Sequence, residues 1–261
     1  MEITLTVIVL SAVLIFAVAL LYSTVGHAGA SGYLAVMALF SLAPGPMKPI
    51  ALTLNIMVAI VGTIRFYWAG FFSWRTFWPF AIASIPAAFI GGWLTLPALV
   101  YKAIVGAVLL YSAVRLFFTA KREDDREIHR VPVWVALIWG AAIGLLSGLT
   151  GVGGGIFLSP LLLLMHWAKT KETSGVSVTF ILVNSIAGLF GHGLLQHFAM
   201  VATLPPAAFV WAPAALLGGF VGAELGTRRL AIAGIRRWLS LVLVIAGLKL
   251  LSEAILPLLY R

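Results

Sequence analysis

The chain has 261 residues, of which 62% are apolar and 10% are charged, and its mean hydropathy is +1.10. A soluble domain carries about 25% charged and about 45–50% apolar residues, so the composition indicates an integral membrane protein. Cysteine is absent, which excludes a disulfide scaffold, a thiol nucleophile and a thiolate metal site. The net charge of +9 lies in short gaps between apolar runs and forms no basic stripe, so we do not expect nucleic-acid binding.

Ten apolar segments follow one another along the chain, and we expect each of them to be helical. They cover 5–25, 33–43, 50–70, 76–96, 100–118, 133–149, 155–167, 174–195, 203–225 and 236–256. No basic residues precede the first segment and no small-residue cleavage site follows it, so it is interpreted as a retained span and not as a signal peptide. The sequence thus predicts an all-α polytopic membrane protein.

The two halves of the chain repeat, and the strongly polar stretch Lys121–Arg130 lies between them. Four sets of residues recur in the same order, with an offset that drifts from 122 to 134: Gly26/Gly29/Gly32 with Gly148/Gly151 and Gly153–Gly155, Asn55/Gly62 with Asn184/Gly191, Pro86–Gly92 with Pro213–Gly219, and Lys102/Arg115 with Arg236/Lys249. We therefore predict an N-terminal membrane repeat at 1–120, a polar linker at 121–131 and a C-terminal membrane repeat at 132–261.

The positions of the basic residues favour inverted repeats of about five segments each. If each half reverses direction five times, thirteen Lys and Arg residues gather at one membrane face, and Lys48, Lys102 and Arg261 remain at the other. With eight spans and parallel halves, the same count is eight against eight. Because cytoplasmic loops are enriched in Lys and Arg, we expect a bacterial cytoplasmic-membrane protein with a cytoplasmic linker and both termini outside.

Glycine-rich turns precede a short segment in each half. Segments 33–43 and 155–167 rise about 16–20 Å, against a hydrocarbon core of about 30 Å, so we expect discontinuous or re-entrant helices whose turns dip into the protein. A helix start offers free N–H donors and a partial positive charge, which suits an anion. The predicted substrate site therefore includes the turn residues Gly29, Ser31, Gly32, Thr150, Gly151, Gly153, Gly154 and Gly155. For the repeated glycines within the helices, close packing is the expected role.

Two asparagines and two histidines add polar groups to the apolar helices. Asn55 and Asn184 occupy equivalent positions, and a buried amide needs partners, so each is either a tether between helices or a substrate contact. His27 in the first turn and His192 after Gly191 are candidates for proton coupling, with a structural histidine as the alternative for both.

Acidic residues are scarce, and the sequence places no carboxylate pair to hold a metal ion inside the membrane, so we expect no metal and no cofactor. Glu224 is expected to pair with Arg228, four residues on. The tryptophans, Trp167 among them, cluster near predicted helix ends and suggest an interfacial belt.

The second turn carries a family resemblance. The run Gly148-Leu-Thr-Gly151-Val-Gly153-Gly154-Gly155, with Pro160-Leu161 following and a weaker copy near the N-terminus, resembles the TauE/SafE sulfite-exporter family over nearly the whole chain. The resemblance implies membrane transport of sulfite, sulfonates or related small anions.

We therefore expect a secondary transporter that alternates access around a midplane site, with proton coupling and a homodimeric state left open. The partners are then a small anion (sulfite, a sulfonate or a carboxylate) and the lipid bilayer. The alternatives are a passive anion channel and an intramembrane enzyme such as a lipid phosphatase. Against the enzyme, the sequence shows no nucleophile or base beside a cationic phosphate clamp.

Overall fold

A computed structural model describes residues 5–118, 128–195, 207–228 and 233–259. These residues form ten helices: α1 (Leu5–Ser23), α2 (Ala30–Leu39), α3 (Pro44–Trp68), α4 (Trp74–Trp93), α5 (Ala98–Phe118), α6 (Val133–Thr150), α7 (Gly155–Leu164), α8 (Thr170–Leu195), α9 (Ala207–Thr227) and α10 (Ala233–Leu259). The predicted all-helical architecture is confirmed, because every predicted segment overlaps one of these helices. Residues 121–127 of the predicted linker and residues 203–206 of the ninth segment lie outside the described residues.

Six helices in the described part of the chain are long and apolar enough to cross a membrane: α1, α3, α4, α6, α8 and α9. Their outward faces carry large apolar side chains, such as Val13 at 58% exposure and Leu217 at 62%. Water would make such a surface costly, whereas lipid tails cover it favourably. The structure therefore supports a multi-pass membrane protein.

The predicted breaks after the first and the sixth segment are present. Helix α2 and helix α7 each have ten residues, or about 15 Å of rise, which is half of a hydrocarbon core. Helix α2 starts three residues earlier than predicted, because Gly29 adopts a left-handed conformation (φ 109°) and caps it. Helix α3 starts six residues earlier than predicted, with Pro44 in its first turn, where a proline costs no hydrogen bond.

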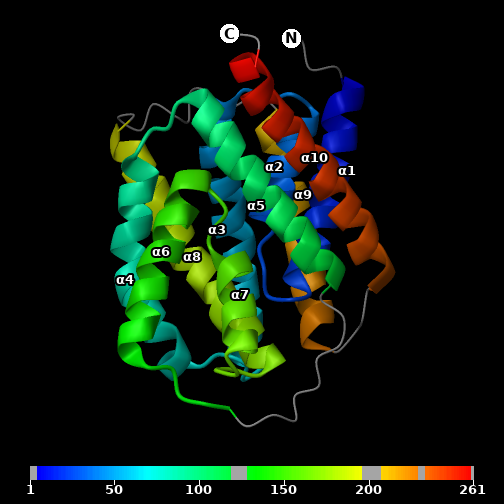
Figure 1. The fold of residues 1–261 in the computed structure, drawn as a ribbon. Helices are drawn as coiled ribbons and strands as arrows, with labels where there is room; N and C mark the ends of the chain where they lie inside the picture. The colour runs from blue at the N-terminus through cyan, green and yellow to red at the C-terminus, as the bar shows by residue number, and fades with distance from the viewer. Residues whose placement is uncertain (1–4, 119–127, 196–206, 229–232, 260–261) are drawn as a thin grey trace.

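The helices pack in pairs that match between the two halves. Helix α9 contacts α1 and α3, and in the matching arrangement α4 contacts α6 and α8. The last helices of the two halves, α5 and α10, contact each other. Figure 1 shows the start of α1 and the end of α10 at the upper end of the molecule, and the start of α6 at the lower end. The first helices of the two halves thus begin at opposite ends of the bundle.

Glycines allow the closest of these contacts. Gly140, Gly144 and Gly148 of α6 lie against the backbone of Phe80, Ser84 and Ala88 of α4, and Gly218, Gly222 and Gly226 of α9 lie in the same way against α1. A side chain at any of these positions would enter the neighbouring backbone, so the small residues set the helix separation. The packing role that the sequence predicted for Gly62, Gly91, Gly92, Gly191, Gly218 and Gly219 agrees with their crowded surroundings.

Candidate functional site

The first glycine turn connects α1 to α2 and is held by hydrogen bonds to the end of α1. The Ser31 hydroxyl lies 2.8 Å from the Tyr22 hydroxyl, and the Tyr33 hydroxyl donates to the Ala28 carbonyl at 2.6 Å. Gly29 and Gly32 are crowded by the Val18 side chain, so no space for a side chain exists at either position. Ser31 is 2% exposed, and its hydroxyl is hydrogen-bonded to Tyr22 of α1.

The second glycine turn connects α6 to α7 and consists of backbone that only glycine adopts easily. Gly151, Gly153 and Gly154 all have φ values between 82° and 84°, in the left-handed region. A Cβ atom at Gly153 would lie 2.6 Å from Asn55 Nδ2, so the turn backbone lies directly against that amide. The whole turn from Gly151 to Gly155 is buried.

His27 joins the two turns. Its Nε2 atom lies 3.1 Å from the Gly155 carbonyl and 3.1 Å from the Ser159 hydroxyl, both on α7. Because a carbonyl only accepts, the bond to Gly155 requires the proton on Nε2. The Ser159 hydroxyl lies 2.7 Å from the Ser177 hydroxyl of α8, so a polar chain runs from the first turn through α7 to α8.

The two equivalent asparagines have different partners. Asn55 Nδ2 donates to the Val152 carbonyl at 3.2 Å and to the Ser185 hydroxyl at 3.4 Å, which ties α3 to the second turn and to α8. Asn184 Nδ2 donates to the Phe180 carbonyl of its own helix at 2.8 Å. Among the described residues neither amide oxygen accepts a hydrogen bond, although both side chains are completely buried. A buried carbonyl oxygen without a donor is costly, so a bound group or water would stabilise both sites.

Thr150 is engaged within its own helix. Its hydroxyl donates to the Leu146 carbonyl at 2.6 Å, as serine and threonine in membrane helices often do. Thr53 and Thr179 bond their own helices in the same way, through the Pro49 and Gly175 carbonyls. These three hydroxyls therefore reach a ligand only if they exchange an intrahelical bond for it.

Lys48 is buried, contrary to the position that the sequence predicted for it. It was counted as a charge at a membrane face, but it is 6% exposed and lies in the second turn of α3. Its Nζ donates to the carbonyls of Gly91, Gly92 and Leu94 at 3.2, 2.9 and 3.2 Å, at the end of α4. A Cβ at Gly151 would lie 3.0 Å from the Lys48 carbonyl, so this lysine also borders the second turn. The proline at the start of α3 is the signal that places Lys48 in the helix.

His192 lies next to Lys48. His192 is 5% exposed and lies beside the backbone of Gly92, whose carbonyl accepts from Lys48 at 2.9 Å. Neither ring nitrogen has a hydrogen-bond partner among the described residues. The candidate site therefore contains two histidines: His27 of the first turn, which contacts the start of α7, and His192 of α8, which lies beside the end of α4.

Other charged groups are used at helix ends. The predicted Glu224–Arg228 pair is confirmed at 2.6 Å, and Arg65 of α3 joins it at 2.9 Å. Lys249, which the repeat pattern matched to Arg115, donates to the carbonyls of Ala38 and Leu39 and thus caps α2. Over the described ranges, no group of three or more His, Cys, Asp or Glu residues is arranged to hold a metal ion.

The expected interfacial position of Trp167 is wrong. This side chain is 6% exposed and packs on Phe80. The turn after α7 folds it back into the bundle, as the positive φ of His166 (54°) indicates. Trp68 and Trp134, in contrast, are 78% and 68% exposed, as a belt requires.

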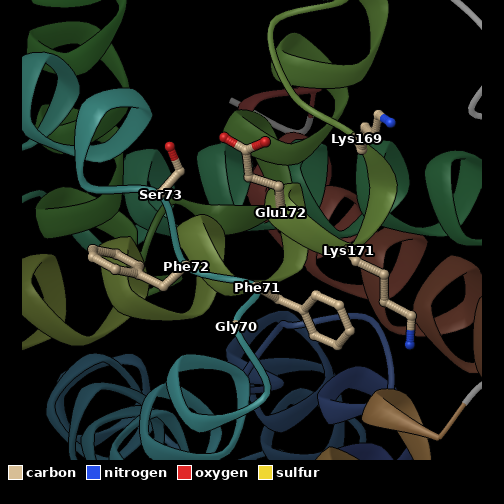
Figure 2. A pocket seen from close by; sticks show the side chains of 7 residues that line it. All are labelled: Gly70, Phe71, Phe72, Ser73, Lys169, Lys171 and Glu172. Atoms are coloured by element: carbon tan, nitrogen blue, oxygen red, sulfur yellow. The ribbon is translucent and has the colours of Figure 1, made fainter.

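A polar pocket of about 430 Å³ opens between the loop that joins α3 to α4 and the start of α8. Figure 2 shows its lining side chains, among them Ser73, Lys169, Lys171 and Glu172. Lys171 donates to the Gly226 and Thr227 carbonyls at the end of α9, and Glu172 accepts from Thr76 at 2.8 Å. The pocket thus lies at the end of the bundle opposite the Lys48 contacts.

Comparison with known proteins shows the family of the chain. The chain matches the family described as "Sulfite exporter TauE/SafE" over residues 11–250. The chain belongs to this family. It is 41% identical over 243 residues to "Probable membrane transporter protein y4hK" of Sinorhizobium fredii, with 92% of this chain and 96% of the relative covered.

More distant relatives carry similar names. "Probable membrane transporter protein YunE" of Bacillus subtilis is 28% identical over 142 residues, with 54% of this chain and 49% of the relative covered. "Probable membrane transporter protein MJ0441" of Methanocaldococcus jannaschii is 25% identical over 193 residues, covering 69% and 68%. No solved structure matches the chain. As a TauE/SafE protein the chain is a multi-pass membrane transporter and not an enzyme, which removes the lipid-phosphatase alternative.

Proposed function

We propose that this TauE/SafE protein is a secondary transporter of sulfite or organosulfonates, and that it alternates access around the two glycine turns. The contact of His27 Nε2 with the Gly155 carbonyl, at 3.1 Å, carries the proposal. This bond brings the turn of one half against the first residue of the short helix in the other half. A substrate bound there would contact both halves and would sense their relative motion.

The chemistry of the turns favours an anion. Helices α2 and α7 both begin at left-handed glycines, Gly29 and Gly154, and a helix start carries unpaired N–H groups and a partial positive charge. Hydroxyls of Ser31 and Ser159 lie beside these helix starts and can donate to oxyanion oxygens. The family description names sulfite, and sulfonates carry the same group of oxygens on sulfur.

The matched packing of the helices supports inverted repeats as the moving parts. A pseudo-twofold axis that relates residues 1–120 to residues 132–261 would map the contact of α1 with α9 onto the contact of α6 with α4. The linker at 121–131 would then be cytoplasmic, with both termini on the outer side of a bacterial cytoplasmic membrane. A homodimer is compatible with the broad apolar outer surface.

Proton coupling is proposed through His27, which contacts Gly155 at the second turn, and His192, which lies beside Gly92. Histidine changes its charge near neutral pH, so a protonated ring would attract the anion and a neutral ring would release it. Asn55 and Asn184 complete the proposed site: their amide oxygens have no donor among the described residues and would accept from a bridging water or from the proton of hydrogen sulfite.

The test uses the purified protein in liposomes. Currents are recorded on a solid-supported membrane after jumps of sulfite, methanesulfonate, sulfate, acetate and lactate, with and without a pH gradient. Exchange of radiolabelled sulfite against unlabelled sulfite across the same liposomes detects electroneutral transport. We expect saturable transport of the sulfur oxyanions that responds to the proton gradient.

Two results would contradict the proposal. Folded protein that neither carries current nor exchanges sulfite or methanesulfonate would overturn the assignment of sulfur oxyanions. A current that increases linearly with anion concentration and shows no accelerated exchange would instead indicate a passive channel.

A further inference from the structure

Lys48 and His192 form a buried pair of basic side chains that the glycine-turn site does not use. Lys48 is 6% exposed and His192 is 5% exposed, and the two side chains come from α3 and α8. An ionisable side chain inside a membrane protein is expensive and usually marks a substrate or ion pathway. The pair lies at the end of α4, next to Gly151 of the second turn.

The hydrogen bonds of the pair are unequal. All three N–H groups of the Lys48 ammonium are taken, because they donate to the Gly91, Gly92 and Leu94 carbonyls. His192 shows the opposite state, since neither ring nitrogen has a partner in the described ranges. A buried imidazole without partners costs free energy, and a ligand with oxygen acceptors would supply the missing bond.

The fold itself does not require a charge at this place. The first turn packs on α8 in the same way as the second turn packs on α3. Gly151 of the second turn lies against Lys48, whereas Gly26 of the first turn lies against an uncharged residue, Ser174. Thr63 follows Gly62 as His192 follows Gly191, and the Thr63 hydroxyl also has no partner among the described residues. Uncharged residues thus serve the same packing in the other half. Packing alone therefore does not explain the positive charge of Lys48, and a bound anion would explain it.

We propose that the Lys48–His192 pair is a subsite that holds the oxyanion group of the transported substrate. This inference rests on the transport function proposed above and adds a residue, Lys48, that carries the positive charge. The anion's oxygens would replace the α4 carbonyls as acceptors for Lys48 and would accept the N–H of His192. In the arrangement described here the subsite is closed, with Lys48 bonded to the helix end.

The competing explanation is a purely structural cap. Cations stabilise the carbonyl ends of helices, and Lys249 does this for α2 through the Ala38 and Leu39 carbonyls and the Ser41 hydroxyl. Lys249 therefore offers a matched control: the same residue, three hydrogen-bond acceptors and a helix end, but no histidine among its contacts. A cap should affect stability alone, whereas a subsite should affect the affinity for substrate.

The experiment measures exchange of radiolabelled methanesulfonate in liposomes containing wild-type, Lys48→Met, Lys48→Arg or Lys249→Met protein. We expect Lys48→Met to raise the KM for methanesulfonate about ten- to hundred-fold, which is the loss of a charge-assisted bond, with partial recovery in Lys48→Arg. Lys249→Met should keep the wild-type KM. Melting temperatures of all variants separate stability from affinity.

His192→Gln keeps the test decisive if Lys48→Met does not fold. Because His192 makes no hydrogen bond to the described protein, a structural role predicts an unchanged KM, whereas the subsite predicts a rise of about five-fold. An unchanged KM in His192→Gln, or equal effects of Lys48→Met and Lys249→Met on the KM, would overturn the subsite. Absence of exchange in the wild-type protein would instead refute the transport function.

Discussion

The anchoring of the second glycine turn by Asn55 can be tested by substitution with alanine. The Asn55→Ala variant loses the 3.2 Å bond to the Val152 carbonyl and the weaker 3.4 Å bond to Ser185. Bonds between membrane helices average about 0.6 kcal/mol, so the two together contribute about 1 kcal/mol. The turn would then open about five-fold more often.

Hydrogen exchange of peptides that span residues 148–156 measures this opening directly. Asn184→Ala is the matched control, because it removes the same atoms but breaks a bond to Phe180 within one helix. We expect about five-fold faster exchange in the turn for Asn55→Ala and no change there for Asn184→Ala. Equal exchange in the turn for wild-type and Asn55→Ala protein would refute the anchoring role.

Three further substitutions test the packing between the halves, each by thermal unfolding in detergent. Gly144→Leu should prevent α6 from packing on α4, because its side chain enters the Ser84 backbone, whereas Gly45→Ala, which has open space, should melt like the wild type. Trp211→Phe removes a 2.8 Å bond to Ser11 and should cost about 0.6–1.7 kcal/mol; no loss would show that this bond between α9 and α1 is dispensable. Glu224→Gln should cost about 1 kcal/mol or less, and high salt should reduce the difference, because its ion pairs are partly exposed.

The helical architecture could be predicted because it depends on local patterns. Apolar length gave the segments, and the glycine runs gave the breaks before α2 and α7, since left-handed backbone such as that of Gly153 is accessible mainly to glycine. The Glu224–Arg228 pair was predictable for the same reason, because its spacing lies within one helix.

The partners of the site residues could not be predicted, because they come from distant parts of the chain. His27 reaches Gly155, 128 residues away, and Lys48 reaches Gly91, 43 residues away. Repetition was also misleading for the asparagines, since Asn55 contacts the second turn and Asn184 bonds its own helix. Sequence spacing indicated which groups need partners, but only the packing of α3, α7 and α8 shows which partners they have.

The proposal that the glycine turns bind the substrate can be tested most directly by anion protection of single cysteines. The natural sequence contains no cysteine, so Ser31→Cys and Ser159→Cys place one thiol beside each turn, and Ser252→Cys places one on the exposed surface of α10. Methanesulfonate is used because sulfite itself reacts with thiol reagents. We predict that methanesulfonate slows alkylation at positions 31 and 159 and leaves position 252 unaffected. Equal alkylation with and without methanesulfonate at both turn positions, in protein that still exchanges it, would contradict the glycine-turn site.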